Sequence, residues 1–181
     1  EAATAEATDR GKPGYQYLFG VDFGKHEDFT VITVVDIKRR ALVWMDRFNQ
    51  IDYHIQMSRL QELYQRFKPV VIIAERNSMG DPLIEQLQRQ GLPVWPFTTT
   101  HATKTEAIDA LALSFERGEI SILNDPVLIG ELLAYTMERL PSGSFRYGAP
   151  DGSHDDCVMS LALAWWGASN TQRPRARSKE Y

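Results

Sequence analysis

Two acidic residues lie at the ends of predicted strands that are far apart in the sequence. Asp22 has Gly20 and Gly24 two residues away on the same strand face, so this face is open to a ligand or to another backbone. The alternative role for Asp22 is to bond the turn that follows the strand. Glu75 directly follows the apolar run 70–74, at the carboxyl end of a predicted strand, which is where α/β sheets place ligands. An unpaired charge there is costly, so Glu75 needs a cation or a raised pKa.

A third acidic group, His154-Asp155-Asp156, lies in the first turn of the last predicted helix. Acids there complement the helix dipole, and Ser153 with Asp156 approximates a capping box, so a structural role is the alternative. These acids and the two strand-end acids can meet only through the fold, and converging carboxylates need cations. Oxygen ligands without a Cys cluster favour Mg²⁺ or Mn²⁺ over zinc.

The segments that must position these acids alternate between strand and helix. Apolar and β-branched residues predict strands over 17–24, 30–37, 41–48, 70–74 and 94–97. Helical spacing and capping residues predict helices over 53–67, 82–91, 103–118 and 126–139, a loose hairpin over 141–152, and a last helix capped by Ser153. The first three strands form a meander. The continuous apolar run 70–74 predicts a strand covered on both faces, central in the sheet and parallel to the first strand.

The composition is that of a globular protein of one domain. The chain has 181 residues, of which 43% are hydrophobic and 24% charged, and single domains commonly have about 100–200 residues. We expect a linker at 1–14, the domain at 15–170 and a basic flexible tail at 171–181. The longest apolar run, 157–167, is shorter than the ~20 residues that a membrane span needs, so no membrane partner is expected.

The charge of the chain argues against bulk attraction to nucleic acid. Lys and Arg number 20 against 24 Asp and Glu, which gives a formal net charge of −4. A nucleic-acid partner would therefore need a local site. Cys157 is the single cysteine, so no internal disulfide can form, which fits a reducing compartment.

Three motifs follow one another along the chain. They are Gly20-Val21-Asp22-Phe23-Gly24 with the nearby Asp28 and Thr30-Val31, then Ala74-Glu75-Arg76-Asn77 with Gly80, then Gly152-Ser153-His154-Asp155-Asp156 before an Ala/Leu-rich helix. In order and spacing they resemble the nuclease domain of tailed-phage large terminases, over about 17–167. The resemblance implies an RNase H-like α/β fold: a mixed sheet, with an antiparallel three-strand meander plus parallel strands, flanked by helices.

The resemblance also implies a metal-dependent endonuclease that cleaves concatemeric double-stranded viral DNA during genome packaging. Asp22, Glu75 and Asp156 match the catalytic, metal-binding acids, and Asp155 is a further metal ligand. Asp28 and His154 would orient ligands or water around them. The implied cofactor is Mg²⁺ or Mn²⁺, as two ions bridged by Asp22 that clamp the scissile phosphate.

The implied partners belong to a phage packaging motor in the host cytoplasm. They are double-stranded DNA, a packaging ATPase domain of the same polypeptide, the portal and the small terminase. No Gly-x-x-x-x-Gly-Lys-Ser/Thr motif occurs in this chain, so we expect a domain excised from a longer protein that carries the ATPase. Candidates for contacts with backbone phosphates are Lys25, Arg76, Lys104 and Arg146, each with an ordinary solvated charge as the alternative.

Three other functions are compatible with parts of the sequence. The Gly-x-Asp-x-Gly hairpin also resembles the phosphate-binding hairpin of sugar kinases and actin-like ATPases, but those proteins pair two such domains and this chain is too short. A non-catalytic docking module would use the carboxylates as caps and turn formers. Another RNase H-like nuclease, such as a Holliday-junction resolvase, would use the same acids on a different DNA substrate.

Overall fold

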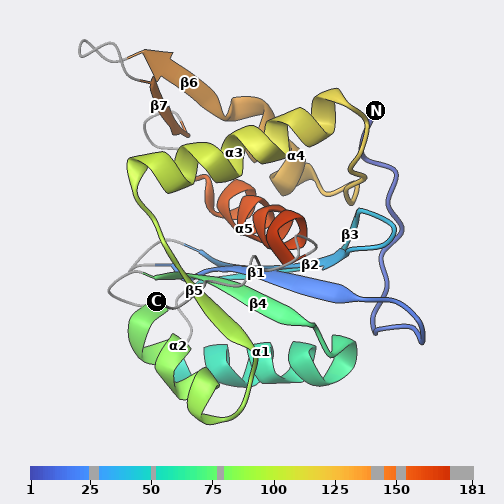
Figure 1. Ribbon diagram of the computed structural model, residues 1–181, viewed down its shortest axis with the longest axis vertical. Coiled ribbons are helices and arrows are strands. Elements are labelled where there is room, and N and C mark those ends of the chain that lie inside the picture. The colour runs from blue at the N-terminus through green and yellow to red at the C-terminus, as the bar shows by residue number, and fades with distance from the viewer. Residues whose placement is uncertain (25–28, 50–51, 77–79, 140–144, 150–153, 172–181) are drawn as a thin grey trace, which may run out of the picture.

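A five-stranded mixed sheet forms the centre of the molecule (Figure 1). This computed structural model describes residues 1–24, 29–49, 52–76, 80–139, 145–149 and 154–171. The strands are β1 (Tyr17–Asp22), β2 (Thr30–Asp36), β3 (Ala41–Phe48), β4 (Val71–Arg76) and β5 (Val94–Thr98), in the order β3-β2-β1-β4-β5. Antiparallel pairing joins β1, β2 and β3, whereas β4 is parallel to both β1 and β5. The expected meander with added parallel strands is confirmed, and β4 is an interior strand.

Helices cover both faces of the sheet (Figure 1). One layer consists of α1 (Tyr53–Phe67) and α2 (Gly80–Arg89), and the other of α3 (His101–Glu116), α4 (Pro126–Ala134) and α5 (Asp156–Thr171). Alternate strand residues enter different cores: Leu18 packs with the α3–α5 layer and Phe19 with the α1–α2 layer. Because Gly20 and Asp22 continue the alternation of Leu18, they lie on the face covered by α5.

Helix α1 begins and ends where its sequence predicts. The Asp52 side chain accepts a hydrogen bond from the His54 amide at 2.8 Å, and Lys68 ends the helix in the left-handed conformation with φ 48°. The buried residues Met57, Leu60, Leu63 and Phe67 repeat at helical spacing and face the sheet.

Helix α3 begins earlier than predicted. The spacing of Thr103 and Glu106 in the sequence fits a capping box with Thr103 as the cap, but Thr100 is the cap and Thr103 is its partner. The Thr103 amide donates to Thr100 Oγ1 at 3.2 Å, and the Thr100 amide donates to Thr103 Oγ1 at 2.8 Å. A threonine hydroxyl can thus take the part of the usual Glu or Gln, because the cap needs only an acceptor within reach.

The predicted helix over 126–139 is wrong in its last part. Helix α4 ends at Ala134, Tyr135 is extended, and β6 (Thr136–Arg139) pairs antiparallel with β7 (Phe145–Gly148). The hairpin expected over 141–152 therefore starts several residues earlier. Backbone pairing with a strand further along the chain decides the conformation of 136–139, and helical spacing does not reveal such a partner. Residues 150–153, with the expected cap Ser153, lie outside the described residues.

Residues 1–14 form no helix or strand but lie along the domain. The Ala5 amide donates to Ile122 O at 3.0 Å, the Thr8 amide to Val43 O at 3.0 Å, and the Gly11 amide to Arg66 O at 2.9 Å. The domain boundaries at 14/15 and 170/171 stay a prediction, and the expected tail is described only at Thr171. Among the helices of the described residues, none combines the length and apolarity required to cross a bilayer.

Candidate functional site

Acidic side chains from two strands and one helix meet at the carboxyl edge of the parallel strands. Asp22 is the last residue of β1, and the pairing of Val21 with Ala74 brings Glu75 of β4 beside it. Asp156 is the first residue of α5, and Asp155 precedes it. Their charges act on Asp22, so all four carboxylates belong to one electrostatic cluster.

Helix α5 reaches this edge because Gly20 leaves room for its backbone. A Cβ atom on Gly20 would lie 1.9 Å from Ser160 O and 2.7 Å from Ala164 N. The Ser160 hydroxyl donates to Gly20 O at 2.9 Å and also bonds Thr33 Oγ1 at 3.0 Å. The sequence left open whether a ligand or another backbone approaches this strand face. At Gly20 it is the backbone of α5.

Asp22 is a buried acid whose pKa is strongly perturbed by its surroundings. Its side chain is buried, with the residue 8% exposed. Burial, the negative charge of Glu75, a hydrogen bond with Glu75, and the charges of Asp156 and Asp155 together raise its pKa well above the ordinary value of 3.8. The ionised form of Asp22 therefore needs a compensating positive charge.

Each of the other acids has a polar partner of its own. Thr99 Oγ1 donates to Glu75 Oε1 at 2.7 Å, and Lys104 Nζ lies 3.2 Å from Asp155 Oδ2. The Phe29 amide donates to Asp156 Oδ2 at 3.3 Å. His154 Nδ1 lies 3.6 Å from the same oxygen of Asp156.

The donor atoms at this edge suit a hard cation. All four acids offer carboxylate oxygen, the ligand that Mg²⁺ and Mn²⁺ prefer. Burial raises the pKa of the nearby Cys157 thiol, so this side chain stays protonated and offers no thiolate. Within the part of the chain that the structure describes, no three His, Cys, Asp or Glu side chains already close around one point.

The predicted phosphate-binding residues are placed unequally. Lys104, on α3, lies at the site through its contact with Asp155. Arg76 Nε instead pairs with Asp81 Oδ1 at 2.8 Å on the surface. Lys25 and the predicted neighbour Asp28 lie outside the described residues, as does the side chain of Arg146 on β7.

The sequence analysis did not predict four residues that contact or support the acidic cluster. Thr99 follows β5 at the same sheet edge, a position that could have drawn attention to it. Phe29 acts through its backbone amide, which no sequence pattern reveals. Glu131 and Arg47 lie on α4 and β3, and only the fold brings them to the start of α5.

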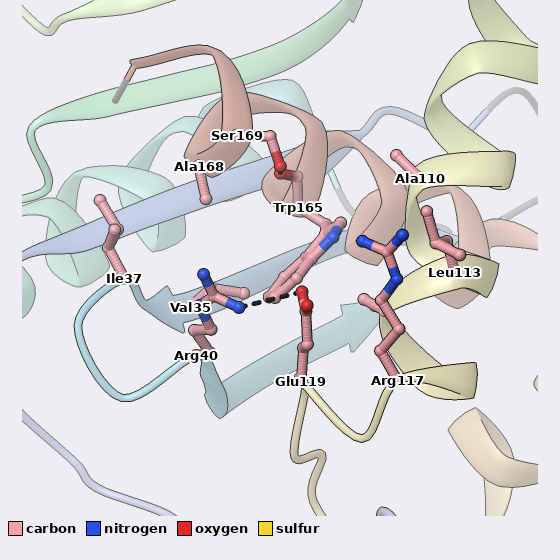
Figure 2. A pocket seen from close by; sticks show the side chains of 11 residues that line it. Val35, Ile37, Arg40, Ala110, Leu113, Arg117, Glu119, Trp165, Ala168 and Ser169 are labelled. Atoms are coloured by element: carbon pink, nitrogen blue, oxygen red, sulfur yellow. Dashed lines mark hydrogen bonds and ion pairs between the residues drawn. The ribbon is translucent and has the colours of Figure 1, made fainter. Parts of the chain in front are cut away.

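A separate pocket of about 300 Å³ lies at the other end of the α5 layer (Figure 2). Trp165 is among the side chains that line it, as are Arg40 and Glu119, which form an ion pair at 2.9 Å. Val35, in its wall, pairs with Leu18, four residues before Asp22 on β1. None of the predicted site residues lines this pocket, so it is distinct from the acidic cluster.

Comparison with known proteins identifies the family of the chain. The family described as "Terminase RNaseH-like domain" matches residues 19–165. The large terminase subunits of Thermus virus P23-45 and Thermus phage G20c are 34% and 33% identical over 155 residues, which is 85% of this chain. The chain spans about a third of the length of these curated relatives, 32% of each.

Solved structures agree with this result. The large terminase nuclease of thermophilic phage G20c with bound magnesium is 32% identical, with a TM-score of 0.81 over 88% of this chain and 85% of that one. The nuclease domain of the Thermus phage P74-26 large terminase is 31% identical, with a TM-score of 0.79 over 89% and 84%. These matches confirm the RNase H-like fold and the resemblance found in the three motifs. The chain therefore belongs to the terminase RNase H-like domain family and is a homologue of large-terminase nuclease domains.

Proposed function

We propose that this chain is a divalent-metal-dependent endonuclease that cleaves concatemeric double-stranded viral DNA during genome packaging. The observation that carries this function is the gathering of Asp22, Glu75, Asp155 and Asp156 at one sheet edge, where burial and neighbouring charges raise the pKa of Asp22. Relatives add support, because the nuclease of phage G20c has been crystallised with bound magnesium, cobalt and zinc.

The proposed cofactor is Mg²⁺ or Mn²⁺, as two ions. Bound divalent cations supply a Lewis acid that activates water and stabilises the leaving oxygen of a phosphodiester. Asp22 and Glu75 offer carboxylate ligands from strand ends, and Asp155 and Asp156 offer theirs from the start of α5. Ligands on strands and a helix are held more rigidly than ligands on loops. His154 contacts Asp156 and orients it, and we assign the same task to Asp28.

DNA is the proposed substrate, bound through its backbone. Lys104 is the best-supported phosphate contact because it lies beside Asp155 and is partly exposed. Lys25, Arg76 and Arg146 are weaker candidates. Contacts of this kind carry no sequence information, so cutting is expected to tolerate many sequences and to weaken with salt.

The proposed setting is a packaging motor in the host cytoplasm. The chain spans about a third of the large terminase subunits that it matches, which supports a packaging ATPase domain elsewhere in the same polypeptide. The portal and the small terminase are the further proposed partners.

Plasmid nicking in Mn²⁺ tests the assignment. Asp22→Asn keeps the shape of the side chain but removes the charge that a cation needs. We expect the rate of nicking to fall by more than about 100-fold, since even partners of metal ligands are worth about 10–100-fold. The matched control is Asp52→Asn at the cap of α1, where Asn serves equally well. Undiminished cutting by a folded Asp22→Asn protein would contradict the proposal.

Substrate shape separates the proposed function from that of a junction resolvase. We expect long duplexes to be cut at least as fast as four-way junctions of the same sequence. A strong preference for the junction would assign the same acids to junction resolution. A well-folded parent chain that cuts neither substrate at any Mn²⁺ or Mg²⁺ concentration would favour a docking module.

A further inference from the structure

A buried carboxylate on α4 lies behind the acidic cluster. Glu131 is only 9% exposed, which is unusual for a glutamate because burying a charge is costly unless it is paired. It lies in the middle of α4, a helix with an otherwise apolar sequence. Its contacts therefore need an explanation beyond the packing of α4.

The first contact of Glu131 is with the start of α5. The Cys157 amide donates to Glu131 Oε2 at 2.8 Å. Cys157 follows Asp156, and amides in the first turn of a helix have no acceptor within the helix itself. A carboxylate there also complements the positive end of the helix dipole. Glu131 thus serves as a cap supplied by another helix, directly beside the acids.

The second contact runs through Arg47 on β3. Arg47 Nε lies 3.9 Å from Glu131 Oε1, and neither atom forms a hydrogen bond within the described residues. The guanidinium carbon lies 3.2 Å from the centre of the Phe29 ring. Phe29 in turn donates its amide to Asp156 Oδ2 and packs edge-on against His154, with ring centres 5.4 Å apart.

We infer that Glu131 and Arg47 are positioning residues for the metal site, an inference that rests on the proposed function. Glu131 fixes the backbone next to Asp156, and Arg47 fixes Phe29, whose amide holds the Asp156 carboxylate. Asp156 is therefore held from both sides, through the Cys157 amide and through the Phe29 amide. Partners of this kind set the orientation of metal ligands and hence metal affinity.

The binding of Mn²⁺ to the 181-residue chain, followed by calorimetry without DNA, tests this role. We expect Glu131→Ala to raise the dissociation constant about tenfold. Glu131→Gln keeps an acceptor for the Cys157 amide, so it should restore most of the affinity. Glu119→Ala is the matched control, because it breaks the ion pair with Arg40 in the separate pocket near the end of α5 (Figure 2). That variant should bind Mn²⁺ like the parent.

Nicking kinetics add a measurement that general loss of stability would not reproduce. In Glu131→Ala the half-saturating Mn²⁺ concentration should rise by the same factor as the dissociation constant, whereas the rate at saturating Mn²⁺ should change little. If Glu131→Ala does not fold, Arg47→Met, which removes the guanidinium that lies over the Phe29 ring, should also bind Mn²⁺ more weakly than the parent. Parental affinity in the folded variants would overturn the positioning role alone. A parent chain that binds no Mn²⁺ would overturn the metal site, and the positioning role with it.

Discussion

Asp22 lowers the stability of the metal-free fold at neutral pH, because burial and neighbouring acids raise its pKa. Below the ordinary value of 3.8 the carboxyl is neutral in both the folded and the unfolded chain. Above it the unfolded chain ionises first, so the free energy of unfolding falls as pH rises toward the folded pKa. In EDTA at pH 7, Asp22→Asn should therefore raise the melting temperature, by about 2–4 °C for each kcal/mol regained.

The control for this effect is a second buried aspartate with the opposite environment. Asp36 accepts hydrogen bonds from the Lys38 and Arg39 amides at 3.1 and 3.0 Å and pairs with the Arg39 guanidinium. Asp36→Asn should destabilise the domain by about 1–3 kcal/mol. Thermal melts of Asp22→Asn and Asp36→Asn at pH 5 and pH 7 would measure both changes in stability. A lower melting temperature for Asp22→Asn at pH 7 than for the parent would contradict the prediction. It would show that groups outside the cluster compensate the charge of Asp22.

The sequence predicted a functional role for a residue where the residue lies at the end of a strand or the start of a helix. Asp22 and Glu75 end apolar strands, and Asp156 starts an apolar helix, so sequence alone points to each of them. Glu131 and Phe29 carry no such mark, since one is a mid-helix glutamate and the other acts through its backbone. Their contribution arises from contacts that only the folded chain creates.

At the scale of elements, the contact between β1 and α5 holds the two halves of the site together. Gly20→Ala would place a Cβ against the α5 backbone at Ser160 and Ala164, which cannot move as a flexible side chain would. We expect a loss of stability of about 1–3 kcal/mol or more, and a lower nicking rate, because α5 must shift away from the sheet.

Gly130→Ala is the matched substitution on α4. A Cβ atom at Gly130 would meet nothing within 4 Å, and the residue lies inside a helix. There we expect a gain of about 0.5–1 kcal/mol from helix propensity. Denaturant unfolding of both variants measures the difference. Equal stability of the two proteins would contradict the close packing of α5 on β1.

Elements with a strong local signal were predicted correctly, whereas those that depend on a distant partner were not. Helix α1 has a cap, a buried stripe and a stop of its own, and its bounds agree with prediction. The segment 136–139 has no stop signal before it and becomes a strand only by pairing with 145–148. Sequence patterns describe local preferences, and tertiary pairing overrides them where they are weak.

At the scale of the whole molecule, an acidic chain is proposed to bind a polyanion. The net charge of −4 gives no bulk attraction to DNA. Four of the acids, however, lie together at one edge, where Asp22 already resists ionisation. Cations bound there would reverse the local charge at the place where a phosphate has to approach. The negative net charge of the chain is thus compatible with a nuclease that attracts DNA only when metal is bound.

Duplex binding measured by fluorescence anisotropy tests this dependence. Ca²⁺ is a suitable probe because it is a hard cation that takes oxygen ligands. We expect weak binding in EDTA and clearly tighter binding in Ca²⁺. Lys104→Ala should reduce the slope of log affinity against log salt by about one, because one phosphate contact is lost. Arg117→Ala, in the distant pocket, should leave the slope unchanged. Equal affinity in EDTA and Ca²⁺ would mean that a basic surface away from the acidic edge holds the DNA.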